Sequence, residues 1–394
     1  MPKVIIIGAG IGGLTAAIAF QQQGFSVKVY EKTSQLSNIG GAFIIYCHGT
    51  RILQKLGLQY IIDSFYTDVQ NFICIDQSEI LMNSSFEKFY SNCGGFLLPM
   101  SRTDLQFKLL ESIPSDNLYM GHKCVKITQD EEKVKVYFEN GVEDEADILI
   151  GADGIYSTVR DSVTSSHVQY TGICFWGGIL KDKYCIDIPK KTLVNILGEN
   201  KISWIVPLSH NRQMWYIAHR MPEENLVRGS DKIAQLPTFC SNWNKYIDQI
   251  LVAPQDEYNF ALPVYEISSI DRWTKGRIAL IGDAAHAFGP VIGQGCSLAM
   301  EDAYILASCI SNSSQNISQG LEQYEFIRKS IVSELHGFEN KQQTMRITNN
   351  PLFIQQRNQI ISSSPVEKLL EPIANLINPT IFQQQVDASK ILTL

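Results

Sequence analysis

The chain has 394 residues, a length that suits two or three domains. Hydrophobic residues make up 45% of it and charged residues 19%, so the composition excludes a disordered or highly charged chain. The net charge of −7, without a long run of lysine or arginine, argues against nucleic acid as a partner.

The nine cysteines are scattered and form no C-x-x-C pair, so we expect neither a disulfide framework nor a metal site. This pattern is typical of a cytoplasmic protein. The apolar run over residues 4–20 is interrupted by four glycines, which favours a strand, a turn and a helix over a targeting segment. Since no stretch reaches roughly 18 uninterrupted apolar residues, we expect no membrane insertion.

The first thirty residues predict a βαβ unit with a parallel sheet. Residues 4–7 form a β-branched apolar run, residues 14–23 suit a buried helix that ends at Gly24, and residues 26–31 alternate as a second strand. Further on, residues 133–139 alternate and are followed by Asn140 and Gly141, the signature of a tight β-hairpin.

The middle of the chain changes in texture. Residues 168–271 are rich in Trp, Tyr, Ile and Val between polar turns, with one helical stretch over 232–251, and predict a β-rich domain. A buried strand over 277–281 and a helix over 295–308 then resume the first domain. Residues 321–345 keep helical spacing, and residues 366–377 predict one amphipathic helix. We therefore expect a discontinuous domain over 1–167 and 273–346, an inserted domain over 168–272 and a helical tail over 347–394.

Gly8, Gly10 and Gly13 form a G-x-G-x-x-G motif between the first strand and helix. The first glycine allows the tight turn, the second lets a pyrophosphate approach the backbone, and the third packs the helix on the sheet. Glu31 ends the second strand, where a carboxylate can accept hydrogen bonds from a ribose. A glycine-rich turn without a ligand is the alternative, but the βαβ context and Glu31 favour a dinucleotide.

Two further motifs resemble those of the flavoprotein monooxygenases of the para-hydroxybenzoate hydroxylase type. They are DILIGADGIYSTVR over 147–160 and RIALIGDAAHAFGP over 277–290. The three motifs occur in the order of that family, and the resemblance covers most of residues 1–346. It implies an α/β fold: a Rossmann-like FAD-binding domain of the glutathione reductase 2 type, with an inserted mixed β-sheet substrate domain and a helical C-terminal tail.

The resemblance also implies a set of FAD-binding residues. Asp283 suits a ribitol hydroxyl, Gly293, Gln294 and Gly295 open a helix toward the N1 and O2 edge of the flavin, and Asp153, Arg102 and Gln106 complete the set. For Asp283 a helix cap is the alternative. For Arg102 the alternative is an exposed arginine at a helix start, and we expect Arg160 to support its loop.

Four residues are candidates for the catalytic region. Pro290, Gly293 and Gly295 bring the backbone close to the flavin while adding few polar groups that would compete for a peroxide. His48 is a candidate substrate-side base, although a solvated loop histidine is the alternative. We expect His286 to be structural and Trp176, Trp204 and Trp215 to lie in the core.

The implied function is monooxygenation with non-covalent FAD. In the family, NAD(P)H reduces the flavin, O2 forms a C4a-hydroperoxide, and one oxygen atom hydroxylates or epoxidises a small aromatic or olefinic substrate. With one G-x-G-x-x-G motif, NAD(P)H is expected to bind transiently. A flavin-dependent halogenase or an isoprenoid double-bond reductase remains an alternative, as does a flavin-binding scaffold without turnover. The substrate, the choice between NADH and NADPH, the oligomeric state and the role of the tail helix stay open.

Overall fold

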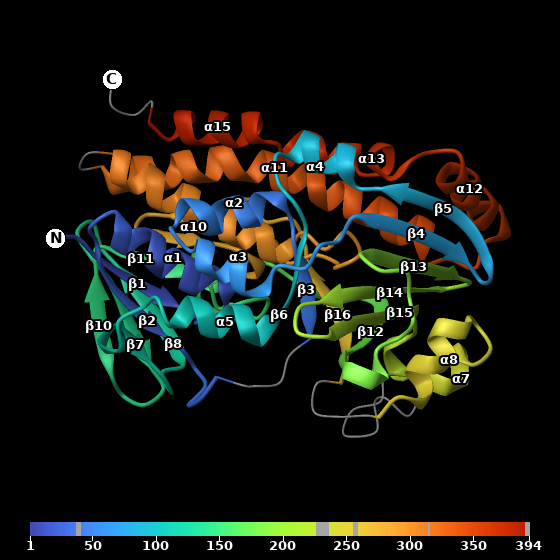
Figure 1. The fold of residues 1–394 in the computed structure, drawn as a ribbon. Coiled ribbons are helices and arrows are strands. Elements are labelled where there is room, and N and C mark those ends of the chain that lie inside the picture. Colours follow the sequence, from blue (N-terminus) through green and yellow to red (C-terminus); the bar gives the residue numbers. More distant parts are fainter. Residues whose placement is uncertain (37–40, 226–235, 255–258, 314–315, 391–394) are drawn as a thin grey trace.

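The computed structural model describes residues 1–36, 41–225, 236–254, 259–313 and 316–390. Two large sheets lie side by side, and helices from the C-terminal part of the chain run along one side of both (Figure 1). The first 30 residues and the β-ribbon lie at one end of the molecule, and the second large sheet lies at the other (Figure 1).

The first large sheet has six strands in the order β17-β18-β11-β1-β2-β7. They are β1 (Lys3–Ile7), β2 (Ser26–Tyr30), β7 (Leu118–Tyr119), β11 (Ile148–Gly151), β17 (Thr274–Lys275) and β18 (Ile278–Leu280). All neighbouring pairs are parallel except β17 with β18. The predicted βαβ unit is confirmed, because β1 and β2 pair in parallel around α1 (Ile11–Gln22). Continuous burial on both faces explains the β-branched runs of β1 and β11.

Several helices pack on this sheet. α10 (Gly295–Asn312) contacts α1, α2 (Cys47–Lys55) and α11 (Ile317–Arg346). α5 (Arg102–Leu110) also contacts α1, and α6 (Thr158–Val163) and α9 (Asp283–His286) follow β11 and β18. α3 (Gln59–Phe65) and α4 (Glu87–Cys93) complete this layer. β18 pairs in parallel with β11, so the strand predicted over 277–281 belongs to the first sheet.

The second large sheet has seven strands in the order β16-β12-β15-β14-β13-β4-β5. They are β4 (Asn71–Asp76), β5 (Glu79–Ser85), β12 (Val168–Lys181), β13 (Thr192–Gly198), β14 (Lys201–Leu208), β15 (Arg212–Arg220) and β16 (Phe260–Ile267). β4 pairs in parallel with β13, so residues 71–85 extend this sheet although the predicted boundary assigned them to the first domain. Residues 71–85 carry no sequence signal that β4 pairs with β13, which lies more than a hundred residues later in the chain.

The outer face of this sheet packs on α7 (Leu236–Cys240) and α8 (Lys245–Val252) through a core that includes Trp176 and Trp215. The single helix predicted over 232–251 is therefore two short helices, and residues 232–235 lie outside the described residues. Asn242 adopts a positive φ of 59° between them, which explains the break.

Two smaller sheets complete the β-structure. β8 (Cys124–Gln129), β9 (Val134–Phe138) and β10 (Glu143–Ala146) form an antiparallel ribbon, and β3 (Ala42–Ile45) pairs with β6 (Leu98–Ser101). The hairpin predicted at Asn140 and Gly141 joins β9 to β10, and Gly141 has a φ of 83° that suits a glycine.

The tail forms α12 (Pro351–Ser362), α13 (Val366–Leu369), α14 (Glu371–Ile377) and α15 (Pro379–Ala388). The amphipathic helix predicted over 366–377 is wrong as one element, because Pro372 lies in the first turn of α14 and starts a new helix. α14 contacts α4 and α11, so the tail packs on the body of the protein. No helix in the described part of the chain is long and apolar enough to cross a membrane.

Candidate active site

The glycine-rich turn between β1 and α1 contains two tightly packed glycines and one open position. A Cβ on Gly8, whose φ is 108°, would lie 2.3 Å from the carbonyl oxygen of Ala152, and a Cβ on Gly13 would lie 2.0 Å from that of Gly8. Gly10, in contrast, has a φ of −74° and no atom within 4 Å of a Cβ. Packing therefore explains the first and third glycines, and the second leaves space free.

A cleft of about 700 Å³ opens beside this turn. Most of the expected cofactor residues line it, namely Gly8, Gly10, Glu31, Arg102, Gln106, Asp153, Asp283 and Gly295. Gly13 lies beneath the turn and does not line the cleft. The structure thus brings together residues from the first strand, α5, the loop after β11 and both ends of the α9–α10 connection.

Glu31 and Gln106 hold the backbone of the turn. The Glu31 carboxylate accepts a hydrogen bond from the Ala9 N–H at 2.9 Å and two from Thr33, and the Gln106 amide donates to the Ala9 carbonyl at 2.7 Å. Both polar groups of Ala9 are therefore occupied by side chains. This shapes the turn between Gly8 and Gly10 while Glu31 still faces the cleft.

The loop after β11 is held from within. The Asp153 carboxylate accepts hydrogen bonds from the Ser157 hydroxyl and from the Thr158 N–H at 2.8 Å, and burial raises its pKa. Arg160 donates to the carbonyl oxygens of Ile155 at 2.6 Å and Ala284 at 3.2 Å. Arg160 thus ties this loop to α9, which is the supporting position expected for it.

Asp283 begins α9, one residue after the cap position, which Gly282 occupies with a φ of 58°. No side chain caps this helix, so Asp283 is not the helix cap that was the alternative interpretation. Desolvation raises the pKa of Asp283, and electrostatic interactions with His286 and Arg102 oppose that rise. Asp283 and Arg102, the latter at the start of α5, are both exposed and both line the cleft.

The connection between α9 and α10 carries the predicted catalytic segment. Pro290 and Gly293, whose φ is 68°, line a second cavity, and Gly295 opens α10 onto the cleft. Gln294 is fully buried; its amide donates to the Ile292 carbonyl at 3.1 Å, and its side-chain oxygen has no hydrogen-bond partner among the described residues. The N-terminus of the 18-residue helix α10 therefore adjoins both cavities.

Glu339 of α11 fixes this connection, and sequence reasoning missed it. One carboxylate oxygen accepts from the Val291 N–H at 2.8 Å and the other from the Ile292 N–H at 2.7 Å, while the side chain is fully buried. Burial raises the pKa of Glu339 to about 8. The available signal was that Glu339 is a charged residue on the core-facing side of the helix predicted over 321–345.

His48 requires a correction. It lies in α2 rather than in a loop, it is fully buried, and it lines neither cavity. Burial and the charges of Arg328 and Arg51 lower its pKa well below the usual value, so it is held neutral. A residue without access to the cavities does not serve as a substrate-side base, and we drop that role.

His286 lies in a buried polar group below α9. Its Nε2 is 2.6 Å from Asp302 of α10, whose other carboxylate oxygen accepts from the Arg328 Nε at 2.8 Å. Asp302 also accepts the Gly282 N–H at 3.0 Å. These contacts position the start of α9, which agrees with the structural role expected for His286.

The second cavity has a volume of about 650 Å³ and shares Phe43, Tyr156 and Asp283 with the cleft. Its wall is mainly aromatic and aliphatic, and strands of the second sheet contribute Phe175, Leu193, Trp204, Val206, Met214 and Tyr216. The tail contributes Val366, Leu369, Leu370 and Ile373. Trp176 and Trp215 lie in the core as expected, but Trp204 belongs to the cavity wall.

The cleft meets a test of whether FAD fits. Gly10, Gly154 and Gly295 all line it, and a Cβ on any of them would meet no atom within 4 Å. At Gly10 and Gly295 neither packing nor a positive φ requires glycine. A ligand that approaches the backbone at these points explains the choice, and a helix N-terminus at both glycines favours the negative charge of a pyrophosphate or a reduced flavin.

Comparisons with known proteins agree with this geometry. The family model described as FAD binding domain matches residues 1–338. An FAD-dependent urate hydroxylase of Klebsiella pneumoniae is 29% identical over 84% of this chain and 87% of that protein. The chloroplastic zeaxanthin epoxidase of Nicotiana plumbaginifolia is 30% identical over 85% of this chain and 54% of that protein. The crystal structure of Klebsiella pneumoniae HpxO with FAD and uric acid superposes with a TM-score of 0.90, at 25% identity, over 96% of this chain and 98% of that one.

Proposed function

We propose, from the premise that this chain belongs to the FAD binding domain family and is an FAD-dependent monooxygenase, that its substrate is a predominantly apolar aromatic or olefinic molecule. One observation carries the proposal: the cavity of about 650 Å³ that meets the cofactor cleft at Asp283 has a wall of aromatic and aliphatic side chains. Cavities of this size hold drug-sized ligands.

The cofactor is FAD, held by residues of the cleft. Gly10 and the start of α1 would receive the pyrophosphate, Glu31 a ribose, and Asp283 a ribitol hydroxyl. Gly295 and the start of α10 would face the flavin edge that becomes negative on reduction. When bound, FAD supplies the redox chemistry of the reaction, taking electrons from NAD(P)H and passing them to O2.

The chain's own contribution is positioning and the exclusion of water. The segment from Pro290 to Gly293 borders the apolar cavity, and its Val291 and Ile292 N–H groups point to Glu339 instead of into the cavity. The loop thus presents few polar groups to a substrate. Apolar walls keep water from the reacting atoms and hold an electron-rich carbon of the substrate close to the cofactor.

The same wall argues against a small polar heterocycle as substrate. HpxO binds uric acid, whose ring is surrounded by hydrogen-bonding groups. In this chain the described cavity wall is mostly apolar, so such a ring would lose hydrogen bonds to water without replacing them. Hydroxylation of a phenol-like ring and epoxidation of an olefin both suit an apolar body, and the size of the cavity favours more than one ring.

The proposed partners are the substrate, O2 and NAD(P)H, the last bound transiently and without its own Rossmann unit. We do not propose nucleic acid as a partner. The nine cysteines, all of them among the described residues, form no disulfide, and seven of them are buried, which suits our proposal of a cytoplasmic protein.

The experiment that tests this function is a screen of purified, FAD-loaded protein for aromatic and olefinic compounds that accelerate NADH or NADPH oxidation. We expect stimulation by polycyclic or alkylated aromatic compounds and little by urate. An oxygenated product then supports hydroxylation or epoxidation. A reduced double bond without added oxygen would instead support a double-bond reductase and contradict the proposal.

A further inference from the structure

Arg346 is the last residue of α11 and lines the apolar cavity. Its Nε donates to the side-chain oxygen of Gln342, one turn earlier, at 2.9 Å, and Gln342 lines the cavity as well. Among the described residues of the wall, Arg346 is the one cationic side chain. The other charged residue of the wall is Asp283, which lies where the cavity meets the cofactor cleft.

Among the described residues Arg346 forms no ion pair with a carboxylate, in contrast to Arg328 and Arg357. Arg328 pairs with Glu301 at 2.6 Å and with Asp302 at 2.8 Å, and Arg357 lies 3.3 Å from Asp76. The ion pairs of the described residues include none for Arg346.

Glu339 lies two turns earlier on α11, but both of its oxygens are occupied by N–H groups of the Pro290–Gly293 loop. Burial lowers the pKa of Arg346, and the acidic groups nearby only oppose that effect. A guanidinium in apolar surroundings without an anion costs several kcal/mol, whereas an anion bound in bidentate geometry offsets much of that cost.

The surroundings of Arg346 define the rest of the ligand. Tyr46 and Gly293 line the same cavity as Arg346, and the Tyr46 ring lies 3.5 Å from the Cβ position of Gly293, in the loop that borders the cofactor cleft. The rest of the wall is mainly aromatic and aliphatic, with side chains from the second sheet and from the tail. The cavity therefore offers one cationic side chain, Arg346, on a wall that is otherwise mainly apolar.

We propose that Arg346 selects substrates that carry one acidic oxygen group, such as a carboxylate or an ionised enol, on an aromatic or polycyclic body. This inference rests on the proposed function for the site and adds the charge of the substrate and the residue that reads it. Because Arg346 acts on binding, it is testable without turnover.

A matched pair of probes isolates the charge. 8-Anilino-1-naphthalenesulfonate and N-phenyl-1-naphthylamine have the same rings, and only the first carries an anionic group, with its sulfonate standing in for a carboxylate. We would measure the affinity of both for the FAD-loaded protein by equilibrium dialysis and use mutual displacement to show a common site. We expect wild type to bind the sulfonate at least about tenfold more tightly than the neutral probe.

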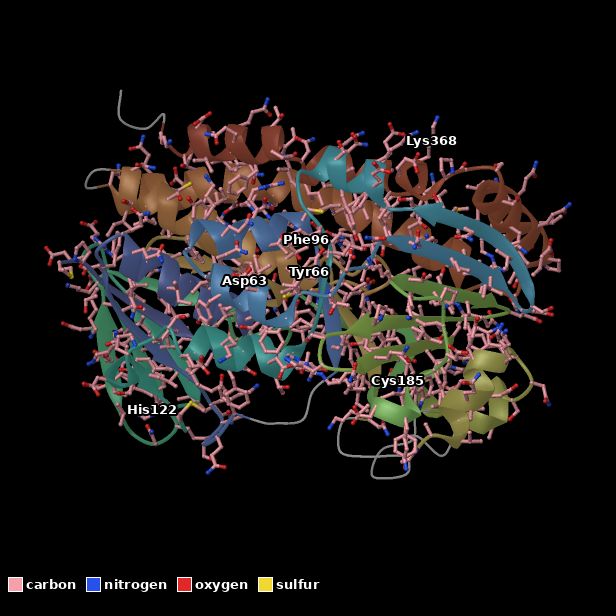
Figure 2. All side chains as sticks on the ribbon, viewed as in Figure 1. Asp63, Tyr66, Phe96, His122, Cys185 and Lys368 are labelled. Atoms are coloured by element: carbon pink, nitrogen blue, oxygen red, sulfur yellow. The ribbon has the colours of Figure 1, made fainter. Side chains whose placement is uncertain are left out.

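Variants then assign the preference. Arg346→Gln should abolish it while leaving the neutral probe unaffected, and Arg346→Lys should retain part of it. Lys368→Gln is the control. Lys368 is exposed on the outer side of the tail helices (Figure 2), so this substitution also removes one positive charge, but outside the cavity. Retained FAD absorbance shows that a variant is folded.

Equal affinity of wild type for the two probes would overturn the proposal without any variant, and so would an undiminished preference in Arg346→Gln. Neither result bears on oxygen transfer, so the proposed function would stand. Conversely, failure to oxygenate any compound would leave the preference for the anionic probe intact.

Discussion

The substitution Glu339→Gln tests whether a buried carboxylate holds the loop that borders the cofactor. Glu339 accepts the N–H groups of Val291 and Ile292, which are 6% and 7% exposed, so neither donor finds water easily. A glutamine has one acceptor oxygen, and its amide group cannot accept the second N–H. One buried donor is then left unsatisfied, which costs about 1–3 kcal/mol, and Glu339→Ala leaves both unsatisfied and costs about 2–6 kcal/mol.

The assay is urea unfolding of the FAD-saturated protein at fixed FAD concentration and above pH 8, where Glu339 is a carboxylate. Glu334→Gln is the matched control, because Glu334 is exposed on the same helix. A displaced loop should also raise the hydrogen peroxide released per NAD(P)H consumed. If Glu339→Gln and Glu334→Gln have equal unfolding free energies and release equal peroxide, the carboxylate does not hold the loop and the reasoning fails.

The pH dependence gives an independent measurement on the same residue. Burial raises the pKa of Glu339 from 4.5 to about 8, so between these values the folded protein binds a proton that the unfolded chain releases. Stability contributed by this group is therefore full below pH 4.5 and falls as pH rises toward 8. We expect that slope to be shallower in Glu339→Gln than in wild type, and an unchanged slope would contradict the assignment.

Three further predictions concern the cofactor, the cleft and the tail. Asp283→Ala should weaken FAD binding by about 1–3 kcal/mol in a fluorescence titration, and unchanged affinity would remove Asp283 from the site. Gly295→Ala should weaken FAD binding and raise peroxide release because its methyl group fills the cleft, whereas Gly337→Ala, at an equally open position outside both cavities, should do neither. Truncation after Ser364 removes part of the cavity wall, so it should weaken the binding of N-phenyl-1-naphthylamine and lower the stability of the protein. Full affinity of the truncated chain for this probe would contradict this role of the tail. A loss of liposome pelleting on truncation would contradict it as well.

Local sequence patterns predicted the elements of the first sheet well. The strand over 4–7, the turn at Gly8 and the strand over 26–31 depend on neighbouring residues, and a buried parallel strand leaves a clear apolar run. That β4 and β5 extend the second sheet was not predicted, because their partner β13 is distant in sequence. The break in the tail at Pro372 was readable from helix chemistry, but the apolar spacing of 366–377 obscured it.

The candidate site shows the same division. Gly8, Glu31 and Asp283 follow strands of one sheet, whose carboxyl ends meet at one edge, so motifs alone could place them together. Glu339 holds the loop beside the cavities, and Arg346 lines the apolar cavity. Both lie on a long helix that carries no motif, and only tertiary packing shows which of its faces they occupy. His48 was misplaced because the residues after β3 gave no sign that α2 begins at Cys47.

The central claim is that this chain transfers one oxygen atom from O2 to an apolar substrate. The direct measurement is turnover under ¹⁸O2 with NAD(P)H and a compound that stimulates NAD(P)H oxidation, followed by mass spectrometry of the product. We predict one labelled oxygen atom in the product. Label that comes only from water, or none with every stimulating compound, would contradict the claim and indicate an oxidase or a dehydrogenase.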